Sequence, residues 1–190
     1  MYARGLLPDL LSAPALGLLE LTGIARGMVA CDAMVKRAQI EVLRAHPIDP
    51  GKYLILFAGP VAEVEEAMEA GEAAAKDMVL DRLLLPNAHD ALVPAVRGQN
   101  PSPTIDALGV LESHTVAGAV VALDAALKAA LVHVVELRLA AGLGGKGYFV
   151  VTGELYDVDA ALEAALAVAG AGAMHEVIAS PHPDFVKRAL

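Results

Sequence analysis

The sequence predicts an α+β protein built from two tandem domains. Three observations support this: one unit occurs twice in the 190 residues, each copy alternates short apolar runs with segments of helical period, and a Gly/Pro/Ser-rich stretch separates the copies. Each copy has the element order β-α-β-β-α-β. This order predicts a split βαβ (ferredoxin-like) domain with two helices on one face of a single sheet.

The repeat appears as matched residues at a nearly constant offset. The run ALGLLE at 15–20 returns as ALGVLE at 107–112, an offset of 92. Further along, Gly51-Lys52 matches Gly145-Lys146 at an offset of 94. The second copy therefore carries two extra residues in one loop. Loops that vary on a constant scaffold are where function is commonly located.

Hydrophobic period and turn residues define the elements of the first copy. Ile24, Met28, Cys31 and Val35 fall on one stripe of a helix, and Pro60 suits the first turn of the next helix. In chain order we expect a strand at 16–22, a helix at 24–38, strands at 40–46 and 52–58, a helix at 61–76, a strand at 78–85 and a short helix at about 88–97.

The same pattern divides the whole chain into four segments. We expect an N-terminal tail at 1–14, which has no counterpart in the second copy, a first domain at 15–97, a linker at 98–106 and a second domain at 107–190. The linker assignment depends on the run RGQNPSPT at 97–104, because Gly, Pro and Ser disfavour regular structure.

Composition excludes several classes of partner. A formal net charge of −9 argues against nucleic acid and anionic lipid as main partners. The longest apolar stretch, 115–135, contains Asp124 and Lys128, which are costly inside a bilayer but form a favourable i,i+4 pair on a solvated helix. We therefore expect a cytoplasmic protein with no membrane partner.

The residues also predict no catalytic or metal site. Cys31 is the only cysteine, and the six histidines show no HxH or HxxxH spacing. No G-x-S-x-G motif and no Walker loop occurs. We expect a protein that is not an enzyme. The weaker enzyme hypothesis has only Glu20, Glu112 and His114 as acid/base candidates, and the first two occupy equivalent strand positions, which favours a structural role.

Several phrases resemble the bacterial microcompartment shell domain. The first copy has LELTGIARGM at 19–28, DAMVKRA at 32–38 and PGKYL at 50–54, and the second has GGKGY at 144–148. The resemblance covers about residues 15–190. It is closest to the unpermuted tandem-domain type of propanediol-utilisation microcompartments.

The resemblance implies a structural function. Three such chains form a flat, pseudo-hexameric tile, which meets hexameric and pentameric tiles of other shell proteins and passes small metabolites through a central pore. It implies a shell location and the following site residues: pore lining by Asp49, Pro50, Gly51, Gly142, Leu143, Gly144 and Gly145, and tile-edge contacts by Lys36, Lys128, His89 and His182. The family's edge arginine is missing from both copies.

The resemblance also bears on cofactors. Some tandem relatives hold an iron–sulfur cluster through a cysteine just before Pro-Gly-Lys, where this chain has Asp49. We therefore expect no cofactor and no iron–sulfur cluster, and we expect Cys31 to be a small buried hydrophobe.

Several residues keep two interpretations. Asp49 is either an ordinary turn acid or one of three carboxylates around an axis. The loop glycines serve tight turns, a crowded pore, or both. Lys52 and Lys146 are either solvated or near the pore mouth, and Lys36 and Lys128 also suit plain helix pairs.

One alternative function comes from another class. Split βαβ modules also form trimeric small-molecule sensors or regulators that bind ligands at subunit clefts, and ligand-dependent thermal stabilisation would favour that function.

Overall fold

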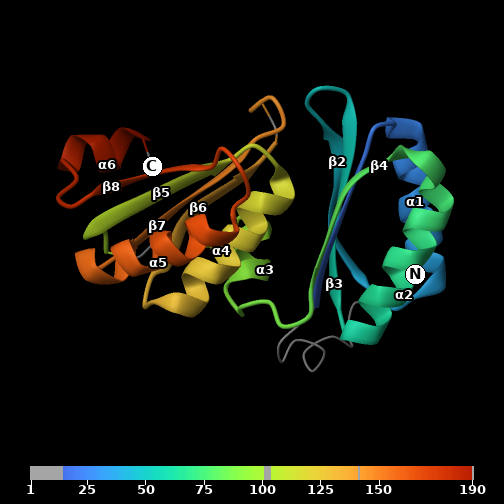
Figure 1. Ribbon diagram of the computed structural model, residues 1–190, viewed down its shortest axis with the longest axis horizontal. Helices are drawn as coiled ribbons and strands as arrows, with labels where there is room; N and C mark the ends of the chain where they lie inside the picture. The colour runs from blue at the N-terminus through green and yellow to red at the C-terminus, as the bar shows by residue number, and fades with distance from the viewer. Residues whose placement is uncertain (1–14, 101–103, 141, 190) are drawn as a thin grey trace. The chain divides into compact units, whose positions relative to one another are not determined.

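A computed structural model of the chain describes residues 15–100, 104–140 and 142–189 (Figure 1). They form two compact units. Of the described residues, the first unit comprises 15–47 together with Gly51–Val93, and the second comprises Ile48–Pro50 together with those from Pro94 onward. The expected tail at 1–14 and positions 101–103 of the expected linker lie outside the described residues.

The first unit has the predicted order of strands and helices. Its elements are β1 (Ala15–Leu21), α1 (Ile24–Arg37), β2 (Glu41–Ile48), β3 (Lys52–Gly59), α2 (Val61–Ala75), the 3₁₀ turn η1 (Lys76–Met78) and β4 (Val79–Leu85). The strands form one sheet in the order β2-β3-β1-β4, with β1 antiparallel to both β3 and β4. Helices α1 and α2 lie together on one face of this sheet (Figure 1). A short helix, α3 (Leu92–Val96), follows.

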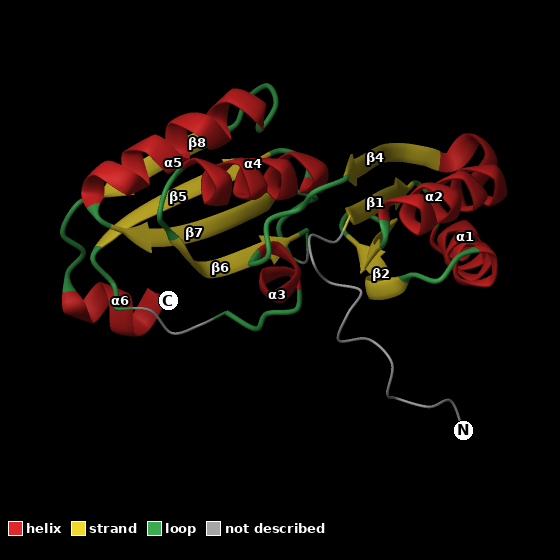
Figure 2. Ribbon diagram, turned by 90° about the horizontal axis from the view of Figure 1, so that it is seen from below, coloured by secondary structure: helices red, strands yellow, loops and turns green. Residues whose placement is uncertain are grey.

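The second unit repeats this plan. Its elements are β5 (Ala107–Ser113), α4 (Val116–Ala129), β6 (His133–Leu139), β7 (Gly147–Gly153), α5 (Leu155–Val168), β8 (Met174–Ile178) and α6 (Pro183–Ala189). The sheet order is β6-β7-β5-β8, equivalent position by position to the first sheet. Figure 2 shows α4 and α5 on the same side of this sheet. The predicted split βαβ fold is confirmed in both repeats.

The core of the first unit lies between its helices and one face of β1 and β3. Leu19, Ile55, Phe57 and Met34 are fully buried there. Gly17 leaves room for an aromatic ring, because a Cβ atom at this position would lie 2.3 Å from the Cζ atom of Phe57. Large side chains thus fill the space opposite a glycine, as dense core packing requires.

The opposite face of the first sheet is also buried. Side chains alternate along a strand, so Leu16, Leu18 and Glu20 point away from the helix-facing Leu19. Their exposed fractions are nevertheless 0%, 0% and 3%. In the second unit, Val110 and Glu112, the counterparts of Leu18 and Glu20, are only partly buried. The two repeats share a fold but differ in which surfaces are covered.

The predicted stripe of the first helix is not its buried face, which corrects the sequence interpretation. Helix α1 buries Gly27, Ala30 and Met34. The stripe residues are 37% exposed at Ile24, 54% at Met28 and 47% at Val35, and Cys31 is half-buried rather than buried. The physical reason is the ring of Tyr53, which lies where a Cβ of Gly27 would be and draws the small-residue face toward the sheet.

The same stripe is buried in the second repeat. Val116, Val120, Leu123 and Leu127 of α4 are exposed by at most 6%. Apolar periodicity therefore located an apolar face in both helices, but it did not specify what covers that face. Within the described part of the chain, no helix combines the length and apolarity needed to cross a membrane.

Candidate functional site

The first predicted pore loop is a short turn between β2 and β3. It consists of Asp49, Pro50 and Gly51, and the Asp49–Pro50 peptide bond is cis. Gly51 has a φ of +77°, and no atom lies within 4 Å of the position its Cβ would occupy. In the single chain, the glycine is therefore explained by its left-handed backbone and not by crowding.

The second predicted pore loop is longer and joins β6 to β7. Gly142, Gly144 and Gly145 have φ angles of +72°, +62° and +90°. Backbone hydrogen bonds close the loop: the amide of Ala140 donates to the carbonyl of Lys146 at 2.9 Å, and the amide of Lys146 donates to the carbonyl of Leu143 at 3.2 Å. Consecutive tight turns thus account for the glycines.

The structure brings residues of both predicted loops together. Residues Ile48–Pro50 belong to the second compact unit, and the carboxylate Oδ2 of Asp49 accepts a hydrogen bond from the amide of Gly142 at 2.8 Å. Asp49 is therefore more than an isolated turn acid. It holds the backbone at the start of the glycine-rich turn.

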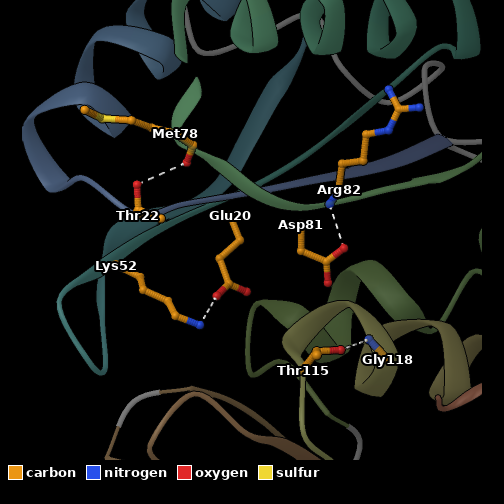
Figure 3. A network of polar contacts seen from close by, with 8 residues as sticks. All are labelled: Glu20, Thr22, Lys52, Met78, Asp81, Arg82, Thr115 and Gly118. Atoms are coloured by element: carbon orange, nitrogen blue, oxygen red, sulfur yellow. Dashed lines mark hydrogen bonds and ion pairs between the residues drawn. The ribbon is translucent and has the colours of Figure 1, made fainter. Parts of the chain in front are cut away.

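The lysines that follow the loops bind glutamates of the central strands. Lys52 Nζ forms an ion pair with Glu20 Oε1 (Figure 3), at a distance of 2.7 Å. Lys146 Nζ lies 3.3 Å from Glu112 Oε1. The side chain of Glu20 is only 5% exposed, and that of Glu112 is 36% exposed. Glu20 and Glu112 thus occupy equivalent positions of the two sheets, and each pairs with the lysine that follows the loop of its own repeat.

The predicted edge lysines form helix ion pairs. Lys36 lies 2.6 Å from Asp32 and Lys128 lies 2.6 Å from Asp124, both in the i,i+4 order. The pairs differ in surroundings, because the side chain of Asp32 is 60% exposed and that of Asp124 is 8% exposed. Both lysine side chains remain substantially exposed, so their ion pairs are compatible with the predicted contacts at a tile edge.

The predicted edge histidines have a local role in both repeats. His89 Nδ1 accepts a hydrogen bond from the amide of Ala91, and His182 Nδ1 accepts one from the amide of Asp184, each at 3.2 Å. Each histidine thus satisfies a backbone donor at the start of a short helix, α3 or α6, where donors otherwise lack partners. This shared turn was not predicted from the sequence.

Among the described residues, no group of three or more His, Cys, Asp or Glu side chains is placed to hold a metal ion. Burial, with a smaller contribution from the Asp32 carboxylate, raises the pKa of the Cys31 thiol. A thiol that stays protonated is a poor metal ligand.

The sequence interpretation missed one surface feature. A hollow of about 300 Å³ lies on the sheet face of the second unit that points away from α4 and α5, lined by Val110, Glu112, Tyr148, Met174, His175 and Glu176. At its border the hydroxyl of Tyr148 donates to Glu136 at 2.8 Å. The pKa of Tyr148 is raised mainly by burial and, to a smaller extent, by this hydrogen bond to Glu136. The sequence of one strand predicts that its side chains alternate between the two faces of the sheet. Only the register between strands shows which of the outward-facing side chains lie next to one another.

Comparison with known proteins places this fold in a family. The BMC domain model matches twice, at residues 15–88 and 107–182. The chain is 42% identical over 171 residues to "Bacterial microcompartment shell protein PduT" of Citrobacter freundii, covering 88% of this chain and 93% of that protein. It is 36% identical over 64 residues to "Bacterial microcompartment shell protein PduA" of the same organism, covering 34% of this chain and 69% of that protein.

A solved structure agrees with the sequence matches. The crystal structure of a microcompartments protein from Desulfitobacterium hafniense DCB superimposes with a TM-score of 0.88 at 39% identity, covering 93% of this chain and 99% of that one. Matches over both repeats and nearly the whole chain confirm the predicted resemblance. The chain belongs to the BMC domain family, as a microcompartment shell protein of the tandem type with two BMC domains.

Proposed function

We propose that the protein is a homotrimeric shell tile whose six BMC domains surround a central pore for small metabolites. The observation that supports this most directly is the equivalence of its two domains: each has the same strand order and a turn-rich loop at the same place between its second and third strands. Six equivalent domains arranged around an axis would place six such loops together. Cyclic closure of this kind is common among homo-oligomers.

The proposed pore is lined by the two loops. From the first domain these are Asp49, Pro50 and Gly51, and from the second they are Gly142, Leu143, Gly144 and Gly145. Three copies of Asp49 would surround the axis with carboxylates, which favour cations and repel anions. The hydrogen bond from Gly142 to one carboxylate oxygen supports this role, because it fixes the orientation of Asp49.

We also propose that this pore holds no iron–sulfur cluster. Such clusters are bound mainly by cysteine thiolates. Asp49 stands where cluster-binding relatives have cysteine, and Cys31 lies on helix α1 with a raised pKa. Permeation in this proposal is governed by pore width and ring charge rather than by redox chemistry or catalysis.

The tile edge would carry Lys36, Lys128, His89 and His182, which meet other shell proteins. The exposure of the lysine side chains, 73% at Lys36 and 45% at Lys128, leaves them accessible to a neighbour. Likeness to "Bacterial microcompartment shell protein PduA" supports a shared mode of assembly with single-domain tiles. The sensor alternative is not favoured, since the shell family covers both domains.

Light scattering and electron microscopy test this function together. The purified chain should have three times the single-chain mass of 19.6 kDa, and at high concentration it should form flat, hexagonally packed sheets or rolled tubes. Thermal stabilisation by micromolar small molecules, with no lattice in any salt, would instead favour the sensor. A monomer that forms no lattice even with single-domain shell proteins would overturn the proposal.

A further inference from the structure

Three large apolar side chains are exposed at one end of the second unit. Leu131 follows helix α4, and Leu155 and Tyr156 begin helix α5; their exposed fractions are 76%, 44% and 82%. The backbone brings them to the same end, because a Cβ atom on Gly153 would lie 2.9 Å from the carbonyl oxygen of Leu131. We call these three apolar residues the Tyr156 patch. Exposed apolar side chains gathered at one place, with charged residues beside them, mark an interaction site.

The equivalent end of the first unit carries smaller or polar side chains. The repeat offsets of 92 and 94 give the counterparts of the Tyr156 patch as Gln39, Val61 and Ala62, all exposed. We call these three residues the Ala62 patch. Its backbone is arranged in the same way, since a Cβ atom on Gly59 would lie 3.4 Å from the carbonyl oxygen of Gln39. The two ends therefore share a backbone plan, but one projects a tyrosine where the other has an alanine.

The charges beside the two patches also differ. Arg37, at the end of α1, lies 3.2 Å from Glu66 and keeps 64% of its side chain exposed, and its repeat counterpart is Ala129. Glu154, the N-cap residue of α5, is exposed, and its counterpart is Pro60. The Ala62 patch thus has a cation beside it that the Tyr156 patch lacks, and the Tyr156 patch has an anion that the Ala62 patch lacks. The two patches are complementary in size and in charge.

Both patches continue the proposed tile edge. Leu131 lies three residues after Lys128, whose side chain is 45% exposed. Gln39 lies three residues after Lys36, whose side chain is 73% exposed. In a tile of three chains, edges with the Tyr156 patch would therefore alternate with edges that have the Ala62 patch.

We propose that the Tyr156 patch of one tile packs against the Ala62 patch of a second copy of this chain in the neighbouring tile. Glu154 then faces Arg37 across the contact. This inference rests on the shell tile proposed above and specifies which of its edges meet. Large side chains opposite small ones fill a contact without a void. Tyrosine suits such a site, because its ring supplies contact area while its hydroxyl stays hydrated at the border.

Pairing of unlike edges is favoured over pairing of like edges. Two Tyr156 patches facing each other would oppose tyrosine to tyrosine and Glu154 to Glu154, with no arginine between them. Two kinds of edge that alternate around a six-edged tile lie on opposite sides of it. Tiles in the same orientation therefore meet through unlike edges on every side. Contacts between unlike surfaces extend an assembly when they do not close into a ring, so one kind of chain suffices for a sheet.

A size exchange in the full-length chain tests the pairing. Tyr156→Ala removes the projecting ring and Ala62→Tyr fills the space for it, and each should raise the protein concentration needed for pelletable sheets about tenfold, as expected for an interface tyrosine. The double variant should restore the wild-type concentration within about twofold, because the two changes compensate. Val168→Ala is the control, since Val168 is 45% exposed at the other end of α5. Its sheets should form as in the wild type.

A charge exchange is the second test and replaces the first if a size variant unfolds. Arg37→Glu and Glu154→Arg should each weaken the sheets by opposing like charges, and the double variant should restore them. Light scattering should give the trimer mass for every variant, because the changes lie between tiles. Circular dichroism checks that each variant is folded.

The outcomes separate this inference from the shell function. If wild-type trimers form sheets and Tyr156→Ala forms them at the same concentration, the edges are wrong while the tile stands. Double variants no better than the single ones would also overturn the pairing. Wild-type trimers that form sheets only with single-domain shell proteins would replace the second copy by a different tile. A monomeric wild type would overturn both proposals.

Discussion

Lys52 Nζ lies 2.7 Å from Glu20 Oε1, which joins the residue after the first loop to the middle strand of its sheet. The Glu20 carboxylate is 5% exposed, and Lys52 is its cationic partner. A buried charge without a partner is costly, so this ion pair ties the loop geometry to the stability of the domain. The second repeat has the same pair, Lys146 and Glu112, in a more exposed setting.

Substituting Lys52 should destabilise the chain more than substituting its counterpart. Lys52→Met leaves a nearly buried carboxylate without its cation and should lower the free energy of unfolding by roughly 1–3 kcal/mol. Lys146→Met should cost less than about 1 kcal/mol, because Glu112 stays hydrated. Urea unfolding at neutral pH measures both. Equal losses of unfolding free energy in the two variants would contradict the expectation that burial of Glu20 makes its ion pair the more important one.

Removing the charge of Asp49 should change the charge preference of the pore and leave assembly intact. Asp49→Asn keeps an oxygen that can accept from the amide of Gly142, whereas Asp49→Ala loses this hydrogen bond, worth about 1 kcal/mol. Both should speed the entry of an anionic dye into assembled shells relative to a cationic dye of similar size. Loss of the trimer in Asp49→Asn would contradict the pore placement.

Truncating the edge lysines should weaken sheets without breaking trimers. Lys36→Ala and Lys128→Ala should reduce the area of ordered lattice in electron micrographs, while light scattering still gives the trimer mass. Lys36→Ala should cost about 0.3–0.5 kcal/mol in stability, as its pair with Asp32 is exposed. Trimer loss would instead assign these residues to contacts within the tile.

Cys31 should react slowly with iodoacetamide in the native protein. Burial and the neighbouring Asp32 raise its pKa, so less of the reactive thiolate is present at a given pH than in the unfolded chain. The rate should rise with pH along a profile displaced to higher pH than that measured in urea. Identical profiles in the two states would contradict the raised pKa.

The raised pKa of Cys31 also predicts how the stability of the protein changes with pH. A pKa raised by folding means that the unfolded chain loses the thiol proton first as pH increases. The contribution of Cys31 to stability is therefore complete below the pKa of the unfolded thiol and is lost as pH rises through the folded value. Unfolding curves of the wild type and of Cys31→Ser across this alkaline range measure the contribution of the Cys31 thiol to the free energy of unfolding. An increase in wild-type stability relative to Cys31→Ser across that range would contradict it.

Much of the fold follows from local sequence pattern. The apolar runs and the turn residues predicted the strands and the two long helices of the first domain within about two residues of their ends, and the repeat at offsets of 92 and 94 predicted the same element order in the second. Such signals are local, since period and turn chemistry act over a few neighbouring residues. The i,i+4 pairs of Lys36 with Asp32 and of Lys128 with Asp124 follow from the sequence for the same reason.

Other features depended on which residues the fold brings together. The stripe with Met28 and the stripe with Val120 have the same period, yet one is exposed and the other is buried, because burial depends on what packs against a face. The bond between Asp49 and Gly142 spans 93 residues, and the hollow beside Tyr148 needs the register of three strands. Sequence alone determined the two domains and their elements; tertiary structure decided which equivalent surfaces are covered, because coverage is set by contacts between distant segments.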